Sequence, residues 1–359
     1  MLKEFVSLRR FFRKQGFFSL FFFQKLTVNM ELYTKLELPS DLPLLNHADQ
    51  LMMLGSCFAT GMGKRLVAGG VCCDVNPFGI LYNPLSISTA LREVVAKRVY
   101  TADDLYFHRD CWHSAMHHGD FSSHSADEVL ERINERISRA HGELGKLQAL
   151  FITWGTAWVY EDKESGRVVG NCHKLPEQNF RRRRLEVDEV VADYKSLLSS
   201  LLARHPSLQV VITVSPIRHI RDGLHENQLS KATLLLAADK LQAIFKGRLS
   251  YFPAYELLID ELRDYRFYAD DLVHPSPLAE EYVWQAFAKC CFTEEARRAM
   301  DECAAVKRML EHRPLHPGTQ EHKQFLEQLM LKIERLTKKY PYLDFQKEWE
   351  QCKAQAGLL

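Results

Sequence analysis

A serine and an aspartate–histidine pair are the residues whose types and positions best suit catalysis. Ser56 follows Gly55, directly after an apolar segment and before a stretch with helical spacing. The N-terminus of a helix favours negative charge, because its first N–H groups lack intrahelical acceptors. An oxyanion formed beside Ser56 would therefore be stabilised, although a serine at this position can also simply cap the helix.

Asp271 and His274 lie three residues apart in one loop, just ahead of Ser276. A serine hydroxyl is a weak nucleophile and needs a base, and a carboxylate fixes the tautomer of a histidine that acts as that base. We expect Ser276 or its neighbour to cap the following helix. The pattern predicts a serine hydrolase with Ser56, Asp271 and His274 as catalytic residues, and it calls for neither a metal nor another cofactor.

Alternating strands and helices are needed to bring these residues together. Apolar segments predict five buried strands, at 49–54, 71–75, 147–154, 208–214 and 248–252. Helical spacing predicts helices over 60–68, 85–95, 126–141, 187–203 and 227–245. Such alternation is typical of a doubly wound parallel sheet, whose sites lie at the carboxyl ends of the strands. Ser56 directly follows the first of these strands.

Six short motifs follow one another along the chain: Gly55–Ala59, Asn76–Gly79, Gly155–Tyr160, Asn171–Lys174, Ser215–Arg218 and Asp271–Ser276. Their order resembles the GSCFA family, a branch of the SGNH (GDSL-like) hydrolase superfamily, over most of the chain after Met30. The resemblance implies a three-layer α/β/α sandwich of the flavodoxin-like type with a five-stranded parallel sheet. It implies Ser56 as nucleophile, the N–H groups of Ser56 and Gly79 as oxyanion donors, and Asp271 with His274 as the last block.

The third oxyanion donor departs from the family's pattern. Many relatives carry an asparagine after the third strand, where this chain has Ala157. Segments 158–160 and 167–169 flank a polar turn, which predicts a β-hairpin. The hairpin would return Asn171 to a position opposite Ala157, where its amide could replace the missing donor. Asn171 could instead cap the turn after Gly170, and His173 or Lys174 could take its place.

Other polar residues follow strand ends or belong to the motifs. The expected substrate contacts are Asn76, Gly155, Thr156, His173, Lys174, Ser215 and Arg218. The run Arg181–Arg184 is typical of a solvated surface, with an anionic substrate or partner as the alternative. Ser230 and Lys231 are interpreted as helix surface. The histidines between Trp112 and His124 lack a known metal-binding spacing, which favours a loop lining the cleft over a metal site.

Composition excludes several classes of protein. A net charge of +1 gives no global field for nucleic acid or an anionic membrane, and no apolar run is long enough to span a bilayer. The 9 cysteines contain no CxxC pair, which indicates reduced thiols and a cytoplasmic location.

Three segments are expected. Residues 1–29, basic and then aromatic, are interpreted as a disordered or spurious extension, with an export signal or an amphipathic anchor as the alternatives. Residues 30–292 form the catalytic domain. Residues 293–359 form a C-terminal helical hairpin packed on the core and broken at 314–318, with an apolar stripe that favours core packing over a partner surface.

The sequence as a whole predicts an enzyme that cleaves an acyl or acetyl ester of a small molecule or carbohydrate through a covalent acyl-enzyme. Two alternatives stay open. The same site could transfer the acyl group to another hydroxyl, or the altered asparagine block could mark a binding protein on a hydrolase scaffold.

Overall fold

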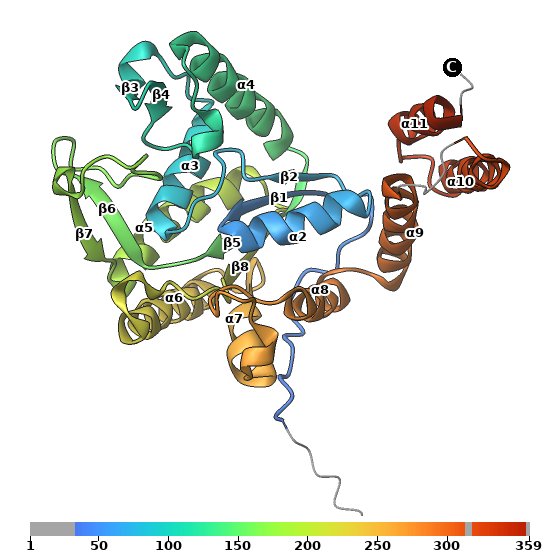
Figure 1. The fold of residues 1–359 in the computed structure, drawn as a ribbon. Coiled ribbons are helices and arrows are strands. Elements are labelled where there is room, and N and C mark those ends of the chain that lie inside the picture. The colour runs from blue at the N-terminus through green and yellow to red at the C-terminus, as the bar shows by residue number, and fades with distance from the viewer. Residues whose placement is uncertain (1–32, 313–317, 357–359) are drawn as a thin grey trace, which may run out of the picture. The chain divides into compact units, whose positions relative to one another are not determined.

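The computed structural model describes residues 33–312 and 318–356. Its centre is a sheet of five parallel strands: β1 (Gln50–Gly55), β2 (Cys73–Val75), β5 (Leu147–Trp154), β8 (Gln209–Val214) and β9 (Leu249–Phe252). Their order is β2-β1-β5-β8-β9 (Figure 1). The five predicted strands are confirmed. Because the order reverses between β1 and β5, the crevice at their carboxyl ends is the switch point at which doubly wound sheets bind ligands.

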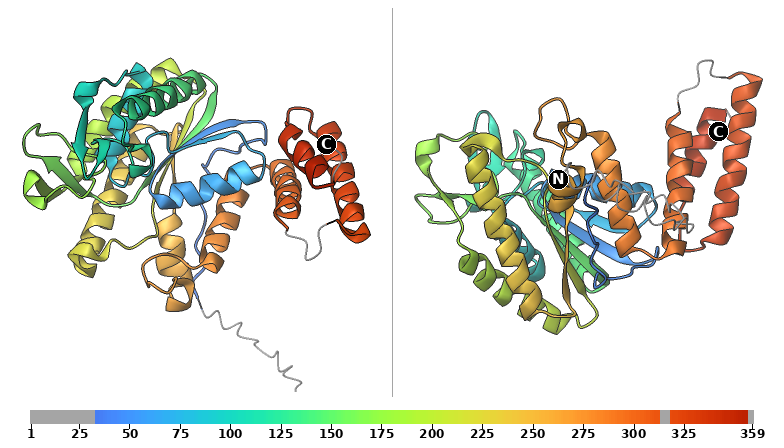
Figure 2. Two further views of the ribbon diagram at one scale, coloured as in Figure 1. Left: turned by 45° about the horizontal axis from the view of Figure 1, so that its top comes forward. Right: turned by 90° about the horizontal axis from the view of Figure 1, so that it is seen from below.

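Helices cover both faces of the sheet because alternate strand residues point to opposite sides. One face packs against α3 (Pro84–Ala96), α4 (Ala126–Leu144), α5 (Val187–Arg204) and α6 (Leu224–Ile244). The other face packs against α2 (Cys57–Ala68) and α8 (Pro277–Cys291). In β1, Met52 and Leu54 belong to the first core, whereas Leu51 and Met53 belong to the second. This is the predicted α/β/α sandwich, and Figure 2 shows its two helical layers from further sides.

Two small antiparallel ladders lie outside the sheet. One joins β3 (Leu105–His108) to β4 (Cys111–Ser114), and the other joins β6 (Trp158–Asp162) to β7 (Phe180–Arg184). The predicted turn after β6 exists, since Val168 pairs with Glu161. However, the main partner of β6 is β7, a strand that the sequence did not reveal.

The C-terminal region is helical, as predicted. It consists of α9 (Glu294–Glu311), α10 (Gln320–Lys339) and α11 (Gln346–Ala356), and α11 is a third helix that the prediction did not include. Leu329 and Ile333 of the apolar stripe are buried with Cys303 of α9 and Cys352 of α11. The stripe therefore forms a core.

Helix α9 also contacts the sandwich, since Lys307 Nζ donates to Val67 O at the end of α2. No helix of the described residues is long and apolar enough to cross a membrane. Residues 1–29, with their basic and aromatic run, lie outside the described residues.

Candidate functional site

The turn between β1 and α2 fixes Ser56 at the switch point. Gly55 has φ +138°, and a Cβ at this position would lie 2.1 Å from Thr153 O of the neighbouring strand. Only glycine fits so close to that backbone. The backbone of Ser56 is extended and occupies the N-cap position of α2, yet its side chain makes no capping hydrogen bond. Ser56 is 1% exposed, and its Oγ has no hydrogen-bond partner in the described structure.

The start of α2 leaves room for negative charge. Its first turn contains no acidic residue and has no side-chain cap, so the first N–H groups of the helix lack both intrahelical acceptors and a cap. The two expected backbone donors are already bonded. Ser56 N–H donates to Thr153 O over a long 3.3 Å, and Gly79 N–H donates to Asn76 O at 2.8 Å.

Asn76 supports the serine turn from the end of β2. Its Oδ1 accepts from Gly55 N–H at 2.8 Å, and its Nδ2 donates to Thr60 Oγ1 of α2 at 2.9 Å. The residue is buried with φ +47°, a left-handed conformation that asparagine tolerates better than most residues. Both ends of its amide are therefore committed to the turn that carries Ser56, and its predicted contact with substrate stays a prediction.

Asp271 and His274 form a hydrogen-bonded pair in the loop before α8. Asp271 Oδ2 lies 2.6 Å from His274 Nδ1, and Oδ1 accepts the N–H groups of Val273 and His274, both at 2.9 Å. These bonds, the His274 N–H first, lower the pKa of Asp271 to about 2. The carboxylate therefore stays ionised, and His274 Nε2 is left for another partner. Ser276 caps α8 as predicted, accepting from Ala279 N–H at 3.3 Å.

The loop after β8 joins this pair to the sheet edge. Arg218 N–H donates to Val273 O at 3.2 Å, and the Arg218 guanidinium lies over the rings of Tyr265 and Tyr268. The next residue, His219, was not among the predicted site residues. Its Nε2 is buried without a partner, beside Gly155 at the end of β5.

Ser230 and Lys231 lie under the strand ends, so their interpretation as helix surface is wrong. Both are 1% exposed. Lys231 Nζ donates to Gly155 O and Ser215 O, each at 2.7 Å. Ser230 Oγ accepts from Ala157 N–H at 2.7 Å and lies 3.0 Å from Thr156 Oγ1.

The signal that identifies this buried face of α6 is its spacing. Ser230 and Lys231 follow the same helical spacing as the buried apolar residues further along the helix. The buried residues of α6 are Asn227, Ser230, Lys231, Leu234, Ala237, Ala238 and Leu241.

The predicted register that set Asn171 opposite Ala157 is wrong. Ala157 O accepts from Leu185 N–H, at the end of the β6–β7 ladder. Asn171 N–H donates instead to Ala115 O at 3.0 Å, and Asn171 Oδ1 accepts from His173 N–H at 2.9 Å. The chain then continues through His173 and Lys174, both at positive φ.

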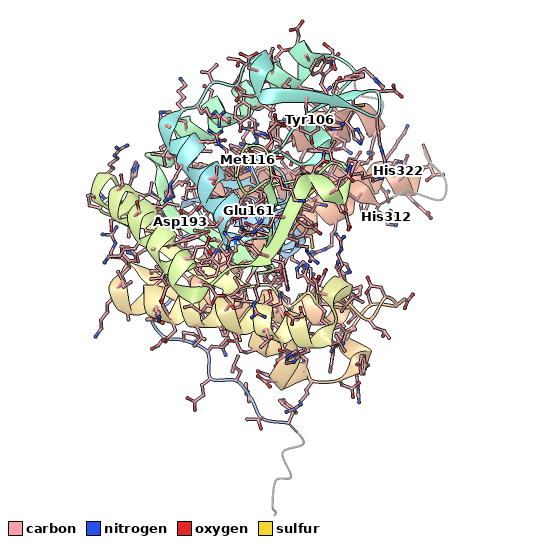
Figure 3. The ribbon with its side chains drawn as sticks, turned by 90° about the vertical axis from the view of Figure 1, so that its left-hand side faces the viewer. Tyr106, Met116, Glu161, Asp193, His312 and His322 are labelled. Carbon is pink, nitrogen blue, oxygen red and sulfur yellow. The ribbon has the colours of Figure 1, made fainter. Side chains whose placement is uncertain are left out.

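Asn171 lines a cavity of about 890 Å³. Tyr106, Met116 and Asp193, labelled in Figure 3, also line it, whereas Ser56, Asp271 and His274 do not. His173 Nε2 lies 2.9 Å from Ser114 O, and burial lowers the pKa of His173 to about 4.

The arginine run is ion-paired rather than simply solvated. It forms β7, in which Arg182 pairs with Asp222, Arg183 with Glu161 and Glu189, and Arg184 with Glu226. Cross-strand and helix carboxylates, which single-sequence patterns do not reveal, neutralise these charges.

The histidine-rich stretch makes local hydrogen bonds, although His117 Nε2 is buried without a partner in the described structure. His113 Nδ1 lies 2.7 Å from Ser122 Oγ, and His117 Nδ1 lies 2.9 Å from Ser114 Oγ. Within the described ranges, no three or more histidine, cysteine, aspartate and glutamate side chains are grouped to hold a metal ion.

Comparisons with known sequences agree with the motifs. The sequence model of the GSCFA family matches residues 50–287, and that of the C-terminal domain of GSCFA domain proteins matches residues 303–356. A comparison with curated proteins gave no match.

Solved structures resemble the chain only distantly. A Streptococcus pneumonia protein proposed to be a platelet activating factor is 10% identical, with a TM-score of 0.35 over 67% of this chain and 83% of its own. A carbohydrate esterase of family 3 from Talaromyces cellulolyticus is 9% identical, with a TM-score of 0.33 over 70% and 99%. The acetyl xylan esterase Est2A from Butyrivibrio proteoclasticus is 9% identical, with a TM-score of 0.34 over 68% and 64%. At these TM-scores we draw nothing from the likenesses.

Proposed function

The chain belongs to the GSCFA family, and from that premise we propose that it is an ester hydrolase that forms a covalent acyl-enzyme on Ser56. The observation that carries the proposal is the uncommitted Oγ of Ser56. A buried hydroxyl without a partner is costly to the fold, so such groups are rare unless they have another use. Here the group lies at an uncapped helix N-terminus, at the switch point of the sheet.

The Asp271–His274 pair would supply the base. Its 2.6 Å hydrogen bond holds the ring with Nδ1 toward the carboxylate, so Nε2 is the nitrogen that would take the proton from Ser56 Oγ. The bond between Arg218 N–H and Val273 O ties the loop of the pair to the end of β8. This tie supports an approach of the pair to the strand-end crevice.

The reaction would proceed in two acyl-transfer steps. Ser56 Oγ bonds to the carbonyl carbon while its proton passes to His274, and the alcohol leaves with that proton. Water then attacks the acyl-enzyme by the reverse proton route and releases the acid. The oxyanion would lie at the first turn of α2, near the N–H of Ser56. Gly79 N–H would have to exchange Asn76 O for the oxyanion in order to donate as well.

The thiol beside the serine is a poor competitor. Burial raises the pKa of Cys57, so the thiol stays protonated and weakly nucleophilic. We therefore assign the nucleophile to Ser56 rather than to Cys57. The substrate class we propose is an acyl or acetyl ester of a small molecule or carbohydrate.

A fluorophosphonate probe tests the nucleophile directly. The wild-type chain should be labelled on the peptide that contains Ser56, and it should hydrolyse p-nitrophenyl acetate. Ser56→Ala should lose both properties. The matched control is Ser88→Ala, a buried serine of α3 whose Oγ donates to Leu85 O at 3.0 Å, and it should keep both. Absence of labelling in folded wild-type protein would favour a binding protein, and ester formation with an added alcohol would favour an acyltransferase.

A further inference from the structure

The imidazole of His219 presents an unused hydrogen-bonding atom to the proposed site. Its Nε2 is buried and has no partner within the described structure. The position of this atom is given by its distance from Gly155. The point that a Cβ on Gly155 would occupy is 3.1 Å from His219 Nε2 and 3.5 Å from Ser56 Cβ. The two side chains therefore face the same small space at the end of β5, which a side chain at residue 155 would fill.

The surrounding contacts hold the ring in place. His219 N–H donates to Asn227 Oδ1 at 2.9 Å, and the ring meets Tyr82 edge-on, with centroids 5.7 Å apart. Lys231 Nζ donates to Gly155 O and Ser215 O, so the ends of β5 and β8 are joined at Gly155, beside the ring. A donor fixed in this way needs no reorganisation when charge develops beside it.

Burial keeps the imidazole of His219 neutral, and the neighbouring groups add to the effect. Burial, and after it the charges of Lys231, His274 and Arg182, lower the pKa of His219 to about 3. These three groups come from α6, the loop before α8 and β7 respectively. A neutral imidazole carries one N–H, and it is a weak base in this environment. The ring is thus suited to donate a hydrogen bond rather than to accept the proton of Ser56.

We propose that His219 is a catalytic residue that supplies the missing third oxyanion donor, with Nε2–H bonded to the substrate carbonyl oxygen as it becomes negatively charged. The inference rests on the proposed serine chemistry. As Ser56 Oγ bonds to the carbonyl carbon, the electron pair of the C=O double bond moves to oxygen. His219 keeps its proton, and His274 takes that of Ser56. His219 therefore does the work that the sequence suggested for Asn171, whose Oδ1 already accepts from His173 N–H.

Steady-state kinetics with p-nitrophenyl acetate on the full chain test this assignment. His219→Ala should lower kcat about 100-fold or more and leave KM nearly unchanged, as loss of one oxyanion donor does. His219→Gln, whose amide can donate from a similar distance, should recover part of the loss. Asn171→Ala is the matched control and should retain kcat.

Three results would overturn the inference. The first is a wild-type kcat in His219→Ala, and the second is a large loss confined to Asn171→Ala. The third is a His219→Ala enzyme as inactive as Ser56→Ala that also loses the pH dependence of the wild type, since His219 would then be the base. If His219→Ala does not fold, as judged by its melting temperature, His219→Gln alone is compared, and a kcat at or below that of background hydrolysis refutes donation. Turnover that survives in Ser56→Ala would refute the proposed function itself, whatever His219 does.

Discussion

Replacing Ser56 by alanine should inactivate the protein without destabilising it. A serine that caps a helix stabilises the fold by about 1 kcal/mol, but Ser56 Oγ makes no such bond. Its burial without a partner instead costs about 1–3 kcal/mol. Removal of the hydroxyl should therefore leave the free energy of unfolding unchanged or raise it by up to about 2 kcal/mol. Turnover should fall by about 10⁴-fold or more, as it does when one member of a catalytic triad is lost.

The comparison needs a serine that does cap a helix. Ser125 is the N-cap of α4, and its Oγ accepts from Glu128 N–H at 3.4 Å. Ser125→Ala should lose about 1 kcal/mol with activity unchanged. Urea denaturation at pH 7 gives both free energies of unfolding, and p-nitrophenyl acetate hydrolysis gives the rates. Ser125→Ala should thus lower the free energy of unfolding, whereas Ser56→Ala should not.

Equal losses of stability in the two variants would refute the reasoning, because Ser56 would then be an ordinary helix cap. A stable Ser56→Ala protein that still hydrolyses the ester would refute the catalytic part alone. The two outcomes are separable because they are read by independent measurements.

Three further outcomes are expected. Cys57→Ser should keep most of the activity, and a loss as large as that of Ser56→Ala would make the chemistry thiol-based. Gly55→Ala should lower the melting temperature strongly, because the new Cβ would lie 2.1 Å from Thr153 O and the backbone has φ +138°. The control is Gly61→Ala in α2, whose Cβ would meet nothing within 4 Å and which should be neutral or stabilising. Similar melting temperatures for the two variants would contradict this prediction. Burial lowers the pKa of His117 to about 3 from an ordinary 6.5. Between these two pH values the unfolded chain binds a proton at His117 that the folded chain does not. The free energy of unfolding should therefore fall as the pH drops from about 6.5 towards 3. Melting temperatures between pH 7 and pH 5 should fall less steeply for His117→Gln, and equal slopes would show that His117 does not contribute.

The strands and the aspartate–histidine loop could be predicted from the sequence because the patterns that indicate them involve neighbouring residues only. Apolar runs such as Ala149–Trp154 are typical of strands covered on both faces. A capping serine such as Ser276 marks its helix from neighbouring residues alone. The loop of Asp271 and His274 closes on itself, so their pairing needs no distant partner.

The predicted position of Asn171 was wrong because its backbone pairs with a distant segment, the loop after β4. Val168 does return opposite Glu161, as the turn predicted. Beyond that point the chain leaves β6, and the N–H groups of Gly170 and Asn171 both donate to Ala115 O. Asn171 therefore pairs with Ala115 instead of Ala157. No sequence pattern within residues 157–171 indicates this pairing with Ala115.

The sequence by itself determined the five parallel strands, the glycine–serine turn and the aspartate–histidine pair, since each depends on the spacing and conformational preferences of neighbouring residues. Only the tertiary structure decided what surrounds Ser56. The ends of β5, β8 and α6 bring together Gly155, His219 and Lys231, which lie far apart in the chain. The tertiary structure also showed that Ser56 Oγ is buried without a cap or partner. Whether a polar atom is satisfied depends on every element packed around it, and that packing exists only once the chain has folded.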